Sequence, residues 1–381
     1  MSLLGIATGD RTVTLLNAFA ALPSVTGTVA QSAASITVAT DRGPVTLHVV
    51  TPEQRGAALV WLTGSRAHCE QLAMRAGRFG LRFDNGQLTR PGRGVVDVPS
   101  EPILYRHLGL PFIAPELRDS ADAIGAAERG ELPALITDAQ VRGDLHVHTT
   151  WSDGRDSLEA MVRAAHQLGY DYVAITDHSE RSLASRNLSV ADIQQQRHEV
   201  EMLRHRMTDM TILHGVEVDI MKDGSLDFDD EVLAGFDIVL ASLHDHGGQD
   251  PAELTSRYLT AIAHPMVNII THPANRTPVL SPGYDVDFDR LFAAAAESGT
   301  AMEVDGAPGH LDMDGALARR AAAAGVTIVV DSDCHRADAL ARQMRFGVGT
   351  ARRGWLEPRH VLNTRGIDDI RAFVAAKRAR A

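Results

Sequence analysis

Histidine and carboxylate residues recur along the second part of this sequence, each time where an apolar stretch ends. In the segment 142–154, RGDLHVHTTWSDG, His146 and His148 flank one apolar residue, and Asp153 follows in a short polar turn. Because alternate side chains of an extended strand point to the same face, both imidazoles are expected to face one site. Imidazole and carboxylate are the donors from which proteins build transition-metal sites. An HxH pair also occurs without any metal, so the rest of the sequence has to decide.

Six further apolar stretches end in residues of the same types. These residues are Asp177 and His178, Glu217 and Asp219, His244 and His246, His272, Glu303 and Asp305, and Asp333 and His335. Histidines scattered through a core would not gather at the same end of successive strands, so we interpret them as parts of one site. Their number exceeds the four ligands of one tetrahedral ion. The pattern therefore predicts two or three ions that share a bridging carboxylate.

The donor set indicates which metals and which reaction to expect. Imidazole with carboxylate suits Zn, Mn, Fe or Co, whereas Mg and Ca prefer oxygen ligands. Several such ions generate hydroxide near neutral pH and stabilise the charge of an in-line displacement at phosphorus, which predicts phosphate-ester hydrolysis. Amide or amine hydrolysis is the chemical alternative, but those binuclear sites commonly use a carbamylated lysine. The only lysines are Lys222 and Lys377, and neither ends a strand-like stretch.

The elements that position these residues can be read from the same pattern. From residue 141 onward, apolar strand-like runs alternate with helical segments in seven βα units, which is typical of a parallel α/β barrel. The active site of such a barrel lies at the carboxyl ends of its strands. Before it, the sequence predicts a hairpin over 33–50, helices on both sides of Thr63-Gly64-Ser65, a proline-containing loop over 101–119 and a short helix ending near Gly130. We expect two domains, a small α+β unit over 1–138 and the barrel over 139–381.

Composition describes an ordinary globular protein of 381 residues with a net charge of −12. Residues 1–140 hold 12 basic and 13 acidic residues, so the acidic excess lies in the second part. This balance argues against tight nonspecific binding to duplex DNA, although an enzyme can still hold a DNA end through its metal ions. No apolar run reaches the length of a membrane span, and Cys69 and Cys334 exclude a disulfide framework. We expect no membrane partner and a cytoplasmic location.

The motifs resemble a known family. GDLHVHTTWSDG, ITDHS, HGVEVDIMKDGSLD, ASLH, THP and SDCH occur in this order, as do the metal motifs of the polymerase and histidinol phosphatase (PHP) superfamily. LGLPFIAPELRD, LPALITDAQVRGDLHVHT and RRGWLEPRHVLNT are similar to the C-terminal half of bacterial family-X DNA polymerases. The resemblance covers nearly the whole chain. It implies a distorted seven-stranded (β/α)7 barrel that holds three divalent ions, preceded by a small α+β remnant of the polymerase palm and thumb. The family typically uses manganese, and sometimes zinc or iron.

The resemblance also implies how the ligands are shared. One ion would be held by His146, His148, Glu217 and Asp333; a second by Glu217, His244 and His272; and a third by Asp153, His178 and His335. Arg276, four residues after His272, matches an arginine that the family keeps near the site, and its guanidinium is suited to bidentate phosphate binding. We therefore expect Glu217, Asp153 and Arg276 to carry the catalytic roles.

The polymerase part departs from the family pattern. Where the family has a catalytic aspartate and an arginine on one strand, this sequence has Thr46 and His48. The other two catalytic aspartates and a helix-hairpin-helix domain are absent from the sequence. Because nucleotidyl transfer needs those carboxylates to hold two Mg ions, we expect no polymerase activity.

Several residues outside the predicted metal shell have weaker expected roles. Asp177 and Asp305 are candidates for orienting imidazoles, a support that metal ligands commonly require. The remaining candidates are Lys222 and Arg181 for phosphate contact, His246 and His310 as general acids, and Cys334 as a packing residue.

The leading hypothesis is a metal-dependent phosphoesterase that acts on DNA ends, as a 3′-to-5′ exonuclease or in 3′-end processing or abasic-site cleavage. One alternative is a small-molecule phosphomonoesterase of the histidinol-phosphatase type. A non-catalytic DNA-binding or scaffold protein is the other. The sequence leaves the exact substrate and the oligomeric state open.

Overall fold

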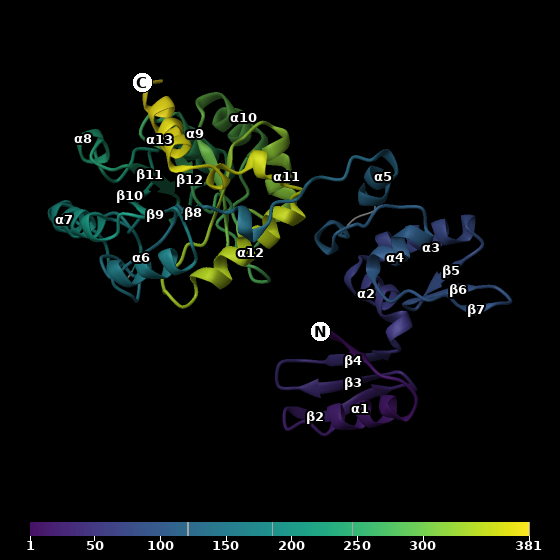
Figure 1. Cartoon of the computed structure of the whole chain (residues 1–381). Coiled ribbons are helices and arrows are strands. Elements are labelled where there is room, and N and C mark those ends of the chain that lie inside the picture. The colour runs from purple at the N-terminus through teal and green to yellow at the C-terminus, as the bar shows by residue number, and fades with distance from the viewer. Residues whose placement is uncertain (120–121, 185, 246, 381) are drawn as a thin grey trace. The chain divides into compact units, whose positions relative to one another are not determined.

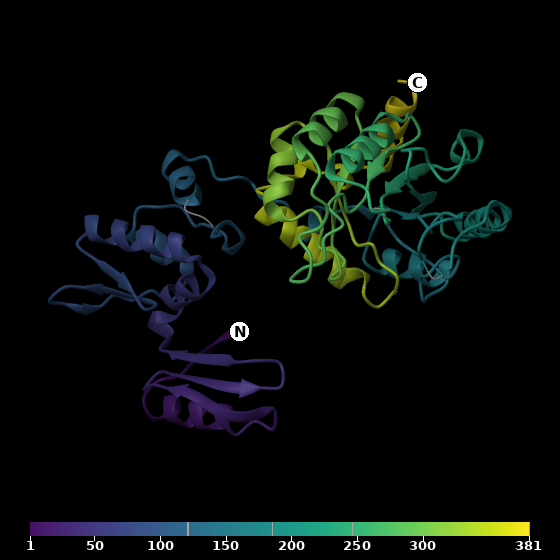
Figure 2. The ribbon, with the colours of Figure 1, turned by 180° about the vertical axis from the view of Figure 1, so that it is seen from behind.

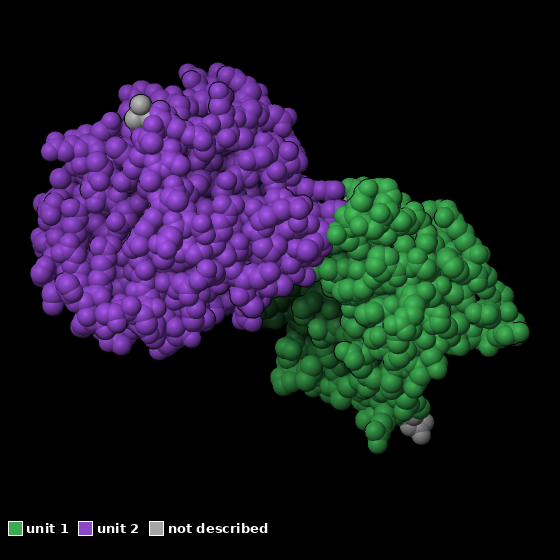
Figure 3. Space-filling model, turned by 45° about the horizontal axis from the view of Figure 1, so that its top comes forward, with its two compact units in different colours: residues 1–132 green, residues 133–381 purple. Residues whose placement is uncertain are grey.

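The fold was analysed in a computed structural model that describes residues 1–119, 122–184, 186–245 and 247–380 (Figure 1). The chain forms two compact units, residues 1–132 and residues 133–381 (Figure 3). Within the described residues, no helix is both long and apolar enough to cross a membrane.

The first unit begins with a four-stranded sheet packed against one helix. The strands are β1 (Ser2–Ile6), β2 (Val25–Gln31), β3 (Ser35–Thr40) and β4 (Val45–Val50), in the order β1-β4-β3-β2, and the helix is α1 (Asp10–Ala20). β3 and β4 are antiparallel with Ile36 opposite Leu47, which confirms the hairpin predicted over 33–50. Ile36 and Leu47 are buried against Leu16 of α1, so one apolar cluster holds the helix on the sheet.

The rest of the first unit is mostly helical. It contains η1 (Pro52–Gln54), α2 (Arg55–Thr63), α3 (Arg66–Arg78), a three-stranded antiparallel sheet of β5 (Arg82–Asp84), β6 (Gln87–Arg90) and β7 (Gly94–Val95), then α4 (Glu101–His107), η2 (Pro115–Leu117) and α5 (Asp122–Arg129). The predicted break between α2 and α3 is confirmed, because Ser65 caps α3 by accepting a hydrogen bond from the His68 amide.

One expectation for this unit was wrong. The segment 101–119, expected to be a loop, contains α4 and η2. Pro102 lies in the first turn of α4, where its missing amide hydrogen costs no helical hydrogen bond. Leu104 and Tyr105 of α4 are fully buried, so tertiary packing stabilises this short helix.

The second unit contains the seven predicted parallel strands in one sheet. They are β8 (Gly143–Asp144), β9 (Tyr172–Ile175), β10 (Thr211–Asp219), β11 (Ile238–Ser242), β12 (Ile269–Ile270), β13 (Ala301–Asp305) and β14 (Ile328–Asp331), and each pairs with its neighbours in chain order. Every residue of β9, β11, β12, β13 and β14 is buried, as expected for a parallel sheet covered on both faces.

Helices follow the strands and surround the sheet (Figures 1 and 2). They are α6 (Leu158–Gln167), α7 (Val190–Arg206), α8 (Asp230–Leu233), α9 (Pro251–Ala263), α10 (Phe288–Ser298), α11 (Gly315–Ala323), α12 (Leu340–Arg353) and α13 (Ile367–Arg378), with the short helices η3 (Asp138–Gln140), η4 (Pro358–His360) and η5 (Leu362–Thr364). Ser or Asp side chains accept amide hydrogen bonds at the N-termini of α6 to α11. These caps mark where each loop from a strand end turns back into a helix.

The barrel is nearly closed, and side chains complete the seam between β8 and β14. The Leu145 amide donates to Asp331 Oδ1 at 2.8 Å, and the Ser332 amide donates to Asp144 Oδ1 at 3.2 Å. The fully buried amide group of Asn363 donates to the carbonyls of both Gly143, at 2.9 Å, and Val330, at 2.6 Å. Beyond the strands, backbone hydrogen bonds also cross the seam, from the His148 amide to the Cys334 carbonyl at 3.0 Å and from the Arg155 amide to the His335 carbonyl at 2.8 Å. The seam therefore lies directly beneath four of the predicted metal ligands.

Candidate metal centre

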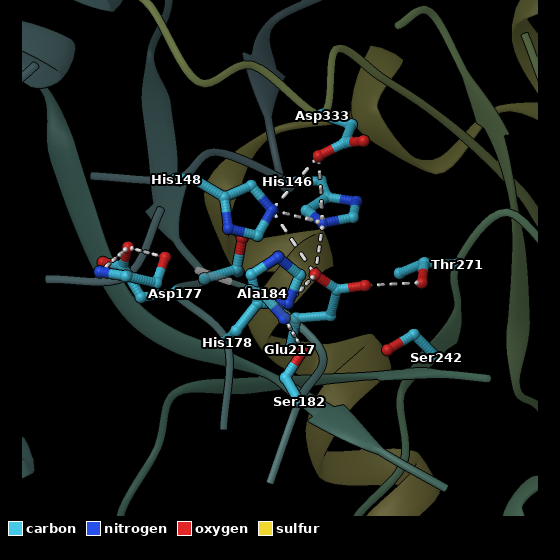
Figure 4. A network of polar contacts seen from close by, with 12 residues as sticks. His146, His148, Asp177, His178, Ser182, Ala184, Glu217, Ser242, Thr271 and Asp333 are labelled. Atoms are coloured by element: carbon cyan, nitrogen blue, oxygen red, sulfur yellow. Dashed lines mark hydrogen bonds and ion pairs between the residues drawn. The ribbon is translucent and has the colours of Figure 1, made fainter. Parts of the chain in front are cut away.

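The two histidines that follow β8 face the same side, as the alternation predicts. Both side chains are fully buried, and the Nε2 atoms of His146 and His148 are 3.0 Å apart (Figure 4). Asp333, which follows β14 across the seam, places its Oδ1 3.1 Å from His148 Nε2 and 3.7 Å from His146 Nε2. The loops that follow β8 and β14, on the two sides of the seam, thus bring two imidazoles and one carboxylate together. Asp333 has a φ of +45°, a strained conformation of the kind that collects at functional sites.

Glu217, on β10, lies at the centre of the imidazole group and is fully buried. Its two carboxylate oxygens have five imidazole nitrogens within 3.5 Å. Oε2 is 3.3 Å from His146 Nε2, 3.4 Å from His148 Nε2 and 3.0 Å from His178 Nδ1, while Oε1 is 3.0 Å from His272 Nε2 and 3.5 Å from His244 Nε2. One carboxylate so placed can bridge two ions.

A third group forms around Asp153. Its Oδ1 is 3.1 Å from His335 Nε2, 3.6 Å from His178 Nε2 and 4.0 Å from His148 Nδ1. Asp153 is part-exposed, whereas His148 is buried, so this group lies on the solvent side of the centre. All nine predicted ligands are therefore brought together. Within them, three sets of donor atoms lie close enough to hold an ion: His148, Asp153, His178 and His335; His146, His148 and Asp333; and His178, Glu217 and His244.

The buried imidazole and carboxylate atoms are better satisfied by a divalent cation than by hydrogen bonds to one another. His148 Nδ1 is buried and has no hydrogen-bond partner among the described residues, and His178 Nδ1 and Glu217 Oε2 lie 3.0 Å apart without forming a well-directed hydrogen bond. Leaving such groups unsatisfied costs about 1–3 kcal/mol each, and more when they are charged. A cation bound between imidazole nitrogen and carboxylate oxygen satisfies both, and this donor set matches Zn, Mn or Fe.

Without ions, the imidazoles and carboxylates of the centre shift one another's pKa values. Burial, with the nearby His335 and His178, lowers the pKa of His148 to about 3. Burial alone would lower the pKa of His272, but the hydrogen bond to Glu217 and its charge raise that pKa to about 9. His335 also has a pKa of about 9, because Asp153 outweighs the effect of burial. Metal binding must therefore displace protons from imidazoles that are charged at neutral pH.

Glu303 and Asp219 hold the outer faces of the ligands, a role that the sequence did not reveal. Glu303 Oε1 is 2.7 Å from His146 Nδ1, and its Oε2 accepts the His272 amide at 2.8 Å. Asp219 Oδ1 is 3.0 Å from His244 Nδ1. Both are strand-end carboxylates that the sequence pattern already includes in the site, but the pattern does not show which imidazole each one contacts, because that depends on the folded barrel. Such partners fix the ring orientation and raise ligand basicity.

Asp177 and Asp305, the two residues expected to orient imidazoles, do something else. Asp177 accepts hydrogen bonds from the amides and hydroxyls of both Thr149 and Ser152, at 2.6–3.1 Å, and from Gln196 Nε2 at 2.7 Å. It therefore holds the turn that presents Asp153. Asp305 Oδ1 accepts the Ala307 amide at 2.5 Å and supports its own loop.

The remaining candidates lie around the centre. Arg276 contacts the loop after β13, donating its amide to Asp312 Oδ2 at 3.3 Å and Nη1 to the Leu311 carbonyl at 3.4 Å. Lys222 and Arg181 line a pocket of about 470 Å³ together with Asp219, which touches His244.

The two histidines considered as general acids, and Cys334, complete the candidates. His310 stacks on His272 with ring centroids 5.2 Å apart, and burial with the nearby His272 lowers its pKa to about 4, so it is neutral at pH 7. His246 lies outside the described residues. Cys334 is fully buried in an apolar cluster with Val147.

Comparison with known proteins gives two family matches. The model of the PHP domain matches residues 144–275, and that of the DNA polymerase beta thumb matches residues 58–119. The chain is 38% identical over 331 residues to the DNA polymerase/3′-5′ exonuclease PolX of Bacillus subtilis strain 168, covering 87% of this chain and 58% of that protein. It thus spans little more than half the length of this relative.

Shorter relatives match the barrel. A probable phosphatase of Shewanella sp. strain MR-4 is 32% identical over 209 residues, covering 52% of this chain and 77% of that protein. Among solved structures, a histidinol phosphate phosphatase from Lactococcus lactis, determined with zinc, L-histidinol and phosphate, aligns with a TM-score of 0.40 and 18% identity, over 55% of this chain and 92% of that one.

Proposed function

Since the chain belongs to the PHP domain family, with a DNA polymerase beta thumb ahead of the barrel, and is homologous to the C-terminal part of PolX, we propose that its metal-dependent phosphoesterase acts on DNA ends. The reaction is hydrolysis of phosphodiester bonds from the 3′ end, with 3′-end processing and abasic-site cleavage as related activities. The observation that carries this proposal is the fully buried Glu217 with five imidazole nitrogens within 3.5 Å. The homology to PolX supports DNA as the substrate.

We assign the ligands as three sets. One ion would be held by His146, His148, Glu217 and Asp333, a second by Glu217, His244 and His272, and a third by Asp153, His178 and His335. Manganese is our first choice of metal, and zinc and iron fit the same donors. Bound ions of this kind supply a water nucleophile at neutral pH and offset the charge that develops at phosphorus.

The protein's own residues prepare this reaction in three ways. Glu303 and Asp219 hold the rings of His146 and His244 through their outer nitrogens. Asp177 holds the turn that carries Asp153 at the solvent side of the centre. We assign Arg276, on the loop directly after His272, to substrate binding, because a guanidinium can bind two phosphate oxygens. Its Nη1 now lies 3.4 Å from the Leu311 carbonyl and 3.5 Å from Asp314 Oδ2, so it would have to leave both to contact a phosphate.

A direct test combines metal analysis with substrate digestion. Purified protein, loaded with Mn, Zn or Co in turn and checked by elemental analysis, is incubated with a 3′-labelled single-stranded oligonucleotide. We expect stepwise shortening from the 3′ end with at least one metal. A metal content above two ions per chain without any shortening would refute the DNA substrate.

A small-molecule phosphomonoesterase is the second candidate, because probable phosphatases of this family align over about three quarters of their own length. A panel of phosphomonoesters discriminates the two. Hydrolysis of one monoester, together with no activity on DNA, would favour the phosphomonoesterase over the DNA-end phosphoesterase. The scaffold alternative is not retained, since the chain is a PHP phosphoesterase with its buried ligand cluster in place.

We also propose that the first unit does not polymerise DNA. Thr46, at the position of a catalytic aspartate in the family, hydrogen-bonds Thr37 across β3 and β4 at 2.9 Å instead of presenting a carboxylate. Primer extension with all four nucleotides and Mg or Mn checks this, and incorporation above background would contradict it.

A further inference from the structure

The loop after β12 carries an unusual tip of two exposed apolar side chains. Val279 and Leu280 are 105% and 84% exposed, and the next most exposed large apolar residue among the described residues of the barrel is Leu183, at 72%. Val279 and Leu280 follow the ligand His272, and Leu183 follows the ligand His178. The three most exposed apolar residues of the barrel therefore all lie on loops at its metal end. Val279 and Leu280 are adjacent in the chain, and a pair of highly exposed apolar side chains on a loop at the metal end can form part of a binding surface.

The tip is held in a strained turn. The Leu280 amide donates to the Thr277 carbonyl at 3.0 Å, with Pro278 in the second position and Val279 in the third. Val279 has a φ of +71°. A turn with this pattern favours glycine in the third position, and a β-branched residue there is a genuine outlier. The chain thus keeps a valine where the backbone would be more stable with glycine. Such strain is typical of sites under functional constraint.

Hydrogen bonds connect the base of the loop to residues beside the metal centre. Thr277 and Ser281 exchange backbone hydrogen bonds at 3.1 and 2.8 Å, which closes the tip. Further down, the Tyr284 hydroxyl contacts the carbonyls of Leu243 and His244 at 3.1 and 3.3 Å. The loop that carries the tip is therefore hydrogen-bonded to the backbone of His244, a proposed metal ligand.

The distance along the chain suits a DNA strand. Val279 lies seven residues after His272, which places it within about 25 Å of the metal centre. Stacked bases rise about 3.4 Å per nucleotide, so a tip within about 25 Å of the metal centre is close enough to reach one of the last seven or so bases of a strand whose end lies at the metals. Apolar side chains are used elsewhere as wedges that enter between bases and unstack them, without regard to sequence.

We propose that Val279 and Leu280 form an apolar wedge that inserts between bases near the end of the DNA strand and unstacks them. This inference rests on the proposed DNA substrate. It assigns the tip to contact with bases, whereas the metal centre acts on the phosphate alone. The strained Val279 is retained because glycine at this position would supply the turn but no wedge.

The test uses the metal-loaded chain of residues 1–381 and its double variant Val279→Gly with Leu280→Ser. Three quantities are measured: the melting temperature, the fluorescence of 2-aminopurine placed near the 3′ end of an oligonucleotide, and the ratio of oligonucleotide hydrolysis to bis(p-nitrophenyl) phosphate hydrolysis. The matched control is Leu168→Ser, which removes an exposed leucine from the end of α6, at the opposite end of the barrel.

For the wild-type protein we expect 2-aminopurine fluorescence to rise on binding, as the base unstacks. The double variant should melt at the same or a higher temperature, because glycine relieves the positive φ. It should also lose the fluorescence rise, and its hydrolysis ratio should fall about tenfold, the scale of losing one base contact. The Leu168→Ser control should keep both the fluorescence rise and the hydrolysis ratio of the wild-type protein. A purely structural role for the tip would instead lower the melting temperature.

Two outcomes would overturn the inference while leaving the proposed function intact. One is a double variant that keeps the fluorescence rise and the ratio. The other is a change of oligomeric state by light scattering in the double variant, which would assign the tip to contact between copies of the chain. A wild-type protein that hydrolyses the small ester but no oligonucleotide would instead refute the DNA substrate itself.

Discussion

Glu303 and His146 form a fully buried pair, with Oε1 of the glutamate 2.7 Å from Nδ1 of the histidine. The other oxygen of Glu303 accepts a hydrogen bond from the His272 backbone amide. One carboxylate therefore contacts two proposed ligands, the ring of His146 and the backbone of His272. The charge of Glu303 also favours a protonated His146, whose pKa lies well above its usual range despite burial. This pairing predicts how the centre responds when its support is weakened.

The variant Glu303→Gln should bind metal about 10–100-fold more weakly, because a neutral amide orients His146 with less electrostatic support. Competition with a chromophoric chelator measures the affinity. Glu297→Gln, on the outer face of α10, is the matched control and should bind as the wild type does. Equal affinities for both variants would show that Glu303 does not act on the metal.

Removal of Glu217 should be far more severe. Glu217→Ala deletes the carboxylate that five imidazole nitrogens approach, so we expect loss of metal and of activity. Cys334 lies between two proposed ligands in the sequence, but its side chain packs in the apolar cluster. The Cys334→Ala variant should therefore lose about 1 kcal/mol of stability and keep its metal. Elemental analysis of both variants checks the pair, and full activity in the Glu217 variant would contradict our assignment.

Asp177→Asn should loosen the turn that carries Asp153. The two carboxylate oxygens of Asp177 together accept five hydrogen bonds. In the variant an NH2 group replaces one of these oxygens, and it cannot accept the hydrogen bonds that the oxygen accepted. We expect a loss of about 1–3 kcal/mol in the free energy of unfolding together with lower activity. Urea unfolding and an oligonucleotide assay measure the two effects. Asp209→Asn, at an exposed ion pair with His166, should change neither.

The stability of the metal-free protein should depend on pH in the alkaline range. His272 and His335 have folded-state pKa values of about 9, above the 6.5 of the unfolded chain. Their contribution is therefore fully present below pH 6.5 and is lost as the pH rises through about 9. We expect the melting temperature of the chelated protein to fall by several degrees between pH 6.5 and 9.5. The metal-loaded protein should show no such fall, because its imidazoles are already deprotonated.

Much of the fold and of the centre could be predicted because it follows from local patterns. Strand alternation placed His146 and His148 on one face, and the rule that parallel strands end together brought Glu217, His272 and Asp333 into one site. The assignments that were wrong depend on tertiary contacts. The helix α4 forms because Leu104 is buried by distant residues, and Asp177 turns toward Thr149 and Ser152 because those donors lie behind it in the folded barrel.

The seam between β8 and β14 links metal content to the closure of the barrel. His146 and His148 leave one side of the seam and Asp333 and His335 the other, while beneath them closure depends on Asp144, Asp331 and Asn363 side chains. Ions that bind ligands from both sides of the seam bind only to the closed barrel. They therefore stabilise the closed state by a free energy that grows with the logarithm of their concentration. Chelation should then speed hydrogen exchange at the His148 and Leu145 amides, while the amides of the β10–β11 ladder stay protected. The proposed metal ions would then serve the reaction and also hold the barrel closed.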